Sequence, residues 1–228
     1  MASAAEQLAA NVNLGAFSKA TELKKRIWFT LGALIVYRLG TFIPLPGIDP
    51  VVLEEIFRAN QSGVLGMFNM FAGGALGRMT IFALNIMPYI SASIIMQLMT
   101  SISPSLEQMK KEGEAGRKRI NQYTRYLTVL ICLLQAYGIA VGIEGMSGNQ
   151  GPAVHEPGYF FRFSVVVTLT GGTMFLMWLG EQITARGVGN GISLIIFAGI
   201  VAELPMALAG TFEMGRTGAL PTGLIIGI

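Results

Sequence analysis

The segment Thr80–Ile102 reads TIFALNIMPYISASIIMQLMTSI and has no charged residue along its whole length. An α-helix needs about 20 mostly apolar residues to cross the hydrocarbon of a bilayer. Two further uncharged runs, Tyr126–Ile143 and Phe163–Gly180, are nearly as long. The sequence therefore predicts three membrane-crossing helices, and Pro88 is expected to kink the first because it removes a backbone hydrogen bond.

Weaker apolar segments flank these three. Ile27–Ile43 contains Arg38, and Gly187–Gly210 contains Glu203; both charges lie near segment ends and are expected to snorkel to an interface. The run Leu220–Ile228 is too short to cross and is interpreted as the start of a sixth helix. With 52% hydrophobic and 13% charged residues, the chain is predicted to be an all-α, polytopic membrane protein.

The basic residues divide unevenly between the two sides of such a bundle. Cytoplasmic segments retain an excess of Lys and Arg. Eleven lie on the side of the amino terminus, namely Lys19, Lys24, Lys25, Arg26, Lys110, Lys111, Arg117, Lys118, Arg119, Arg125 and Arg186. Only Arg58, Arg78, Arg162 and Arg216 lie on the other. The amino terminus is therefore expected in the cytoplasm.

The densest basic segment is Met109–Tyr126, MKKEGEAGRKRINQYTRY. Positive-inside bias alone predicts a cytoplasmic loop of this kind, and docking of a cytosolic partner is the alternative. Glu107, Glu112 and Glu114 dilute the positive charge, which argues against simple phosphate binding.

One apolar segment, Met67–Leu76, is too short to span, since ten helical residues cover about 15 Å. A helix of this length at membrane depth must be surrounded by protein or line a water-filled cavity, so a re-entrant half-helix is one interpretation. An amphipathic helix on the outer surface is the other. Neighbouring glycines, including Gly73 and Gly74, would allow close packing.

Catalysis has little support, because the apolar spans hold no paired carboxylates, no Ser-His-Asp set and no metal-ligand cluster. Cys132 is interpreted as a packing residue and His155 as a loop residue. No enzyme activity, cofactor or metal is expected. A secondary transporter or a membrane scaffold is the alternative to a pore, but the uncharged spans lack the midplane ionisable groups of ion-coupled transporters.

Four strings nevertheless resemble one known family. FIPLPGID at Phe42–Asp49, FNMFAGGALGR at Phe68–Arg78, IMPYISASIIMQLM at Ile86–Met99 and GEQITARGVGNGIS at Gly180–Ser193 are similar to the bacterial SecY family in order and spacing. The resemblance implies a protein-conducting channel of ten helices in two halves. This chain would supply the first five and the beginning of the sixth.

In that family a short segment plugs the resting channel from the outer side. The resemblance assigns this plug to Met67, Phe68, Asn69, Met70, Phe71, Ala72, Gly73, Gly74, Ala75 and Leu76. Arg78 matches a position near the pore, although an interfacial anchor remains an alternative for it.

The family's pore narrows at a ring of isoleucines. Spacing alone favours packing or lipid-facing roles for such residues. The resemblance instead assigns ring positions to Ile86, Ile90, Ile192 and Ile196. A small apolar neck holds water poorly, so it would resist ions while a passing polypeptide fills it. Ser91 and Gln135 match the polar cluster of the family's lateral gate, where interhelical hydrogen bonds of about 0.6 to 2 kcal/mol would hold the gate closed.

The resemblance also implies partners and a location. These are the membrane subunits SecE and SecG, the SecA motor and the ribosome on the cytoplasmic side, signal sequences, nascent polypeptides, and the lipid of the bacterial inner membrane. Basic residues that could contribute a subsidiary docking contact are Lys110, Lys111, Arg117, Lys118 and Arg119.

Overall fold

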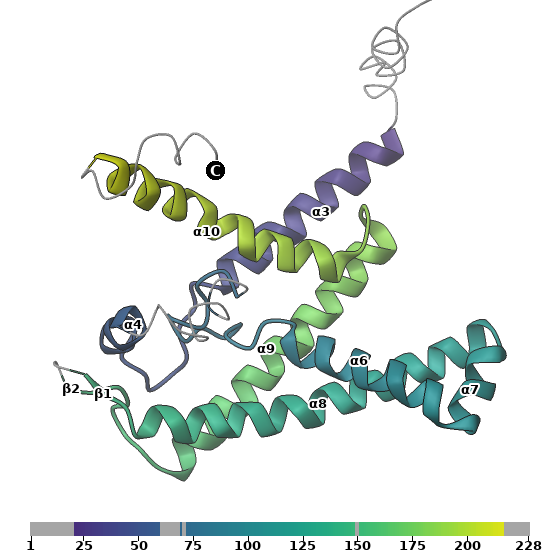
Figure 1. The fold of residues 1–228 in the computed structure, drawn as a ribbon, viewed down its shortest axis with the longest axis horizontal. Helices are drawn as coiled ribbons and strands as arrows, with labels where there is room; N and C mark the ends of the chain where they lie inside the picture. Colours follow the sequence, from purple (N-terminus) through teal and green to yellow (C-terminus); the bar gives the residue numbers. More distant parts are fainter. Residues whose placement is uncertain (1–20, 60–68, 70–71, 149–150, 217–228) are drawn as a thin grey trace, which may run out of the picture.

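The computed structural model describes residues 21–59, 69, 72–148 and 151–216 (Figure 1). This part of the chain is predominantly helical, as expected. Its helices are α3 (Thr21–Gly40), α4 (Pro50–Ala59), α6 (Met87–Ile102), α7 (Pro104–Lys111), α8 (Glu114–Glu144), α9 (Tyr159–Arg186) and α10 (Gly191–Arg216). The expected sixth helix, 220–228, lies outside the described residues.

Two very short strands interrupt the helical pattern. β1 (Ser147–Gly148) pairs antiparallel with β2 (Gly151–Pro152), between α8 and α9. A bridge between Ile48 and Val154 joins the segment after β2 to the chain before α4. The connection between α8 and α9 is therefore tied to the rest of the fold. We call this side of the molecule the hairpin end.

The helices form a layered bundle in which α9 is central. α6 and α8 lie side by side, and α9 crosses between them and the pair formed by α3 and α10 (Figure 1). α7 folds back against both α6 and α8. The side of the molecule that carries α7 and the start of α8 is called the basic end below.

The second expected span differs from the sequence prediction. Residues 81–86 form turns, and α6 begins only at Met87. Pro88 therefore lies in the first helical turn, where its missing N–H would have had no partner in any case. The predictions of a continuous helix from Thr80 and of a kink at Pro88 are therefore wrong. The preceding chain instead pairs with the segment after α3, through Ile81 N donating to Ile43 O at 3.0 Å.

The expected basic loop Met109–Arg125 is also largely helical. α7 ends at Lys111, Gly113 turns the chain with a φ of 78°, and α8 starts at Glu114. Gly tolerates this left-handed conformation because it has no Cβ. α8 has 31 residues and thus a length of about 46 Å, well beyond the roughly 30 Å of hydrocarbon. Its basic first turns can therefore stand outside a membrane that the rest of the helix crosses.

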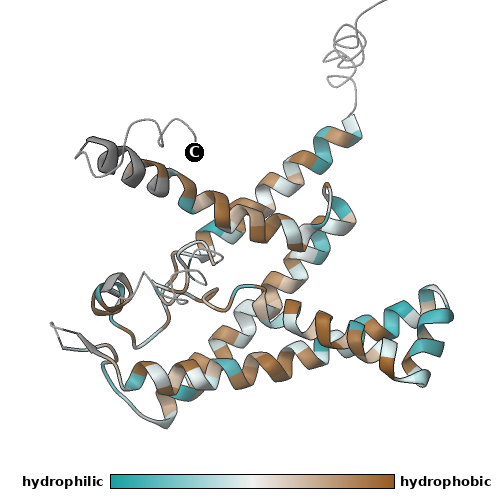
Figure 2. Cartoon of the chain, in the orientation of Figure 1, coloured by the Kyte–Doolittle hydropathy of each residue, from teal (hydrophilic) through white to brown (hydrophobic). Residues whose placement is uncertain are grey.

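Apolar surface covers much of the outside of the bundle. Two described helices, α8 and α9, are long and apolar enough to cross a membrane, and α6 and Gly191–Pro205 of α10 are shorter apolar helices. Brown, hydrophobic residues line α6, α8 and α10, whereas teal residues gather on α7 and the start of α8 (Figure 2). Large apolar side chains such as Ile94, Leu98, Leu130 and Leu134 are exposed on the protein. Such a surface suits contact with lipid or with other membrane proteins.

Two clusters of buried residues stabilise the arrangement. The first joins α4, α8 and α9 at the hairpin end, with Leu53, Ala136, Val165 and Leu169 at its centre. The second joins α3, α9, α10 and the residues just before α6, and includes Tyr37, Phe82, Leu176 and Ile195. Because α9 contributes to both clusters, it fixes the position of the other helices.

The turn between α9 and α10 is held by short polar side chains. Asn190 caps α10 by accepting from the backbone N–H groups of Ile192 and Ser193 at 3.1 and 3.3 Å. Thr30 of α3 accepts from Val188 N at 3.1 Å. A Cβ on Gly191 would collide with the carbonyl of Gly180, so glycine is needed for this close approach.

Candidate functional site

Three of the four predicted ring isoleucines lie where α3, α6, α9 and α10 come together. Ile86, the residue before α6, belongs to the second buried cluster, and Ile90 and Ile192 pack against that cluster. The structure thus brings together three residues from segments about a hundred positions apart. Ile196 lies one turn after Ile192 on α10 and is partly exposed.

The four isoleucines do not have equivalent surroundings. Ile86 is only 1% exposed and is enclosed by residues of this same chain. Ile90, Ile192 and Ile196 each keep part of their surface accessible. Ile86 therefore has almost no surface with which it could line a pore, whereas the other three have some.

The predicted plug segment is only partly described. Met67, Phe68, Met70 and Phe71 lie outside the described residues. Ala72–Leu76 forms turns rather than the second part of a half-helix, so the helical prediction is wrong for these five residues. Gly73 and Gly74 have φ values of 61° and 78°, which side chains with a Cβ rarely adopt. We call residues 72–76 the plug turn.

Polar contacts surround the plug turn. Asn69 accepts from Gly77 N through Oδ1 at 2.6 Å and from Gly74 N through its carbonyl at 3.0 Å. Arg38 of α3 donates from Nη1 to the carbonyl of Gly73 at 3.0 Å. The expectation that Arg38 snorkels to an interface is therefore incomplete, because its guanidinium binds the plug turn.

Phe42 brings two guanidinium groups together next to this turn. Arg38 and Arg78 lie over its ring, with Cζ atoms 5.0 and 4.9 Å from the ring centroid. A cation over an aromatic face is attracted by the ring quadrupole. Arg78 is partly buried here, and so its interpretation as a simple interfacial anchor is less favoured than a role beside the plug turn.

The two lateral-gate candidates lie on neighbouring helices. Ser91 is partly buried on α6, and Gln135 is exposed on α8. Gln135 lines a cavity of about 400 Å³ between α6, α8 and the plug turn, which Ala72 and Leu76 also line. Among the lining residues only Gln135 has a polar side chain. The cavity therefore connects the gate candidate on α8 with the plug turn, while Ser91 lies outside its lining.

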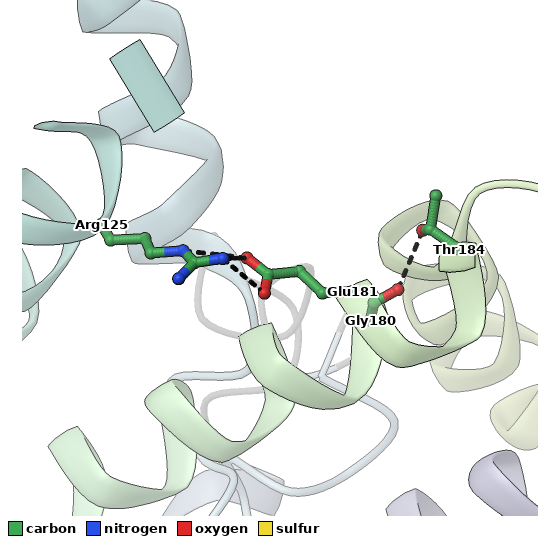
Figure 3. Close-up of polar contacts among 4 residues, drawn as sticks. All are labelled: Arg125, Gly180, Glu181 and Thr184. Carbon is green, nitrogen blue, oxygen red and sulfur yellow. Dashed lines mark hydrogen bonds and ion pairs between the residues drawn. The ribbon is translucent and has the colours of Figure 1, made fainter. Parts of the chain in front are cut away.

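An ion pair joins α8 and α9 nearer the basic end. Arg125 donates from Nε and Nη2 to the Glu181 carboxylate at 3.0 and 2.6 Å (Figure 3). One turn further along α9, the Thr184 hydroxyl donates to Gly180 O at 2.9 Å. Both charged residues line a cavity of about 360 Å³ that Tyr89 and Ile192 also line. A cavity with several polar side chains in its lining thus adjoins the predicted ring residue Ile192.

The predicted docking residues extend along the basic end. Lys110 and Lys111 end α7, while Arg117, Lys118 and Arg119 lie in the first turns of α8; all five are exposed. Lys111 pairs with Glu107 at 2.6 Å on the same helix. An exposed pair of this kind contributes little stability. The positive charges of the other four residues are exposed and available to a partner or to lipid headgroups.

The opposite end carries a second interhelical ion pair. Arg162 Nη2 lies 2.7 Å from Glu144 Oε2, and Gly158 N donates to Glu144 Oε1 at 3.1 Å. The hydrogen bond from Arg162 is the main cause that lowers the pKa of the Glu144 carboxyl, and partial burial opposes it. This pair closes the connection that contains β1 and β2.

Comparison with known proteins identifies the family. A family model described as SecY matches residues 80–228, which is more than half of the chain. The chain belongs to the SecY family. The match begins at Thr80 and so includes all four ring candidates and both gate candidates.

Individual SecY relatives match over most of this chain. It is 60% identical over 199 residues to the protein translocase subunit SecY of Buchnera aphidicola subsp. Acyrthosiphon kondoi, covering 87% of the chain and 56% of that relative. It is 59% identical to the corresponding subunit of Escherichia coli strain K12, covering 87% of the chain and 45% of that protein. The chain spans about half the length of the curated relatives it matches.

Solved structures share the SecY-type fold. A protein-conducting channel matches with a TM-score of 0.56 at 22% identity, covering 85% of this chain and 38% of the other. A SecY structure described by its plug domain matches with a TM-score of 0.54 at 21% identity, covering 85% and 37%. At these identities the likeness concerns the fold.

Two residues near the site of this SecY-family chain make contacts that the sequence did not predict. Arg38 was expected to snorkel and Glu181 drew no interpretation, yet both make contacts between distant segments. A charged residue within an apolar segment is itself a signal for a specific partner. That signal was present for Arg38, but the partner, a backbone carbonyl, has no sequence signature.

Proposed function

We propose that this chain forms the amino-terminal part of the channel subunit of a Sec protein translocase. The observation that carries the proposal is the identity of 59–60% with proteins named protein translocase subunit SecY, sustained over 199 residues. The channel passes unfolded secretory proteins across the membrane and releases transmembrane segments into lipid through a lateral gate. It is a passive conduit and no enzyme; its partners supply the energy.

The proposed topology places α3, α6, α8, α9 and α10 across the bacterial inner membrane. The amino terminus and the basic end face the cytoplasm, since the basic residues gather there. The hairpin end faces outward. The length of α8 supports this placement, because its basic first turns can project while its apolar remainder crosses.

The proposed neck is lined by Ile90, Ile192 and Ile196, with Ile86 supporting it from behind. Support comes from the position of Ile86, Ile90 and Ile192 at the junction of α6, α9 and α10, and from the accessible surface of Ile90, Ile192 and Ile196. A narrow apolar neck dewets and resists ions, and a polypeptide of any sequence can displace the seal. Residues 67–76 would close this neck from the outer side as the plug.

The lateral gate involves α6 and α8, with Ser91 and Gln135 as its polar residues in this chain. The apolar cavity beside Gln135 supports the proposal because an apolar segment leaving the channel needs such a surface. Proposed partners are SecE and SecG within the membrane and SecA or the ribosome at the basic end. Lys110, Lys111, Arg117, Lys118 and Arg119 supply a subsidiary cytoplasmic contact.

Reconstitution tests this function directly. The full-length protein encoded by the gene that carries this chain would be reconstituted with SecE and SecG of the same organism, then supplied with SecA, ATP and a secretory precursor. We expect ATP-dependent protection of the precursor from external protease. Gly191→Leu is the negative control, because its side chain would collide with α9. Absence of protection by a well-assembled unmutated complex contradicts the proposal.

A further inference from the structure

The plug turn rests directly on α10. A Cβ placed on Gly73 would lie 3.0 Å from Gly199 Cα and 3.1 Å from Gly199 O. A Cβ on Gly74 would lie 2.6 Å from Glu203 Oε1. Gly199 and Glu203 are four residues apart on α10 and therefore share one face of the helix. Two adjacent glycines of the turn thus contact two residues on one face of α10.

The charges around this contact are complementary. The same position above Gly74 lies 3.6 Å from Arg78 Nη2, so the Glu203 carboxylate and the Arg78 guanidinium both border Gly74. Arg78 Nη1 is buried and has no hydrogen-bond partner within the part of the chain that the structure describes. A buried guanidinium nitrogen without a partner is costly, and the half-buried Glu203 supplies a carboxylate that borders the same glycine as Arg78.

The contact also connects the plug turn to the neck. α10 carries Ile192 and Ile196 about three and two turns before Glu203. α10 also packs on α3, whose Arg38 binds the Gly73 carbonyl. A movement of α10 away from the neck would therefore draw Gly199 and Glu203 away from the turn. Occupation of the neck and release of the plug would be coupled through one helix.

We infer that Gly199 and Glu203 of α10 form the seat that holds the plug turn in the resting channel, with Glu203 as the counter-charge of Arg78. The inference rests on the proposed function, since a seat matters only if residues 67–76 close a pore. Glu203 is a positioning residue: it acts on ion flow through the plug turn and need not touch a translocating chain.

Ion conductance of the full-length protein, measured in planar bilayers with potassium chloride, tests the role of the charge. Glu203→Gln keeps the shape and removes the charge, and we expect the resting conductance to rise about tenfold, as for loss of one charge-assisted interaction. Glu156→Gln, at an exposed residue of the hairpin end, is the control and should leave it unchanged. A Glu203→Gln channel as tight as the unmutated one contradicts the counter-charge.

A double-mutant cycle separates contact from general damage. Gly74→Ala should raise conductance strongly when Glu203 is present and several-fold less in a Glu203→Ala background, because the colliding carboxylate has gone. Gly73→Ala collides with the backbone of Gly199 instead, so its effect should be the same in both backgrounds. Independent effects of Gly74→Ala and Glu203→Ala would overturn the seat.

Crosslinking provides a readout that does not depend on conduction. In a Cys132→Ala background, Gly74→Cys with Glu203→Cys should be joined by a short bifunctional thiol reagent in the resting protein, because the Glu203 side chain reaches Gly74. Gly74→Cys with Val201→Cys should not, because Val201 is exposed elsewhere on α10. Failure of the first pair to crosslink contradicts the seat even if the complex translocates protein. Efficient crosslinking in a complex that translocates nothing supports the contact and contradicts the proposed function instead.

Discussion

Arg125 on α8 and Glu181 on α9 form a two-pronged ion pair, with Arg125 Nη2 2.6 Å from both carboxylate oxygens of Glu181. The pair bridges 56 positions of sequence and connects the two described helices that are long and apolar enough to cross a membrane. Its side chains are 47% and 37% exposed. Solvent therefore screens the attraction, so the pair contributes little energy. Its significance lies in its geometry, which fixes the placement of α8 against α9.

Breaking this pair should weaken the protein only slightly. Arg125→Gln is expected to reduce stability by about 1 kcal/mol or less. Arg125→Glu should cost more because it places like charges together, and the exchanged pair Arg125→Glu with Glu181→Arg should recover part of the loss. Thermal unfolding in detergent measures this, with Arg119→Gln on the exposed start of α8 as control. Equal melting temperatures for Arg125→Glu and the exchanged pair would show that the contact is not formed.

The Glu144–Arg162 pair should make stability depend on pH. The hydrogen bond from Arg162 lowers the pKa of Glu144, so the folded state favours the charged carboxylate more than the unfolded state does. Its contribution is thus present at neutral pH and is lost as the pH falls through the lowered pKa. Glu144→Gln should melt at a lower temperature than the unmutated protein at pH 7. That difference should shrink in acid, and a constant difference would contradict the assignment.

Topology can be tested with single cysteines in a Cys132→Ala background. Gly116 is a poor site because a Cβ there would collide with the Met109 carbonyl. Lys118 on α8 and His155 at the hairpin end are both exposed. Applied to intact spheroplasts, an impermeant thiol reagent should label Lys118→Cys only after the membrane is opened and His155→Cys without opening. The reverse pattern would invert the proposed orientation.

The neck isoleucines should separate into two classes when replaced by Asn. Ile90→Asn with Ile196→Asn adds hydrogen-bonding groups to accessible surface, so we expect wetting of the neck and a rise in resting ion conductance. Ile86→Asn buries an amide inside the cluster of α3, α9 and α10, at a cost of about 1–3 kcal/mol.

Planar-bilayer conductance and thermal unfolding of the same full-length variants distinguish the classes. The Ile90 and Ile196 double variant should assemble normally and leak, whereas Ile86→Asn should lower the melting temperature. If the assembled double variant has the conductance of the unmutated channel, Ile90 and Ile196 pack against helices or lipid and do not line the neck.

Local chemistry was enough to predict much of the fold. Uncharged runs at Tyr126–Ile143 and Phe163–Gly180 lie within α8 and α9, since helix formation in an apolar setting depends on length and composition. The sequence motifs that include Ile86 and Ser193 indicated the SecY family. Two predictions were wrong because one local pattern is compatible with two structures. A proline such as Pro88 can kink a helix or begin one, and a basic segment can form a loop or helical turns.

The sequence by itself determined that this is a largely helical, apolar chain of the SecY family, because periodicity, charge and motif order reside in neighbouring residues. Only the tertiary structure decided that Ile86 is enclosed while Ile90 is accessible, that Arg38 binds the Gly73 carbonyl, and that Glu203 borders Gly74. Each of these depends on the approach of segments far apart in the chain. Such an approach is set by how whole helices pack, which no local pattern specifies.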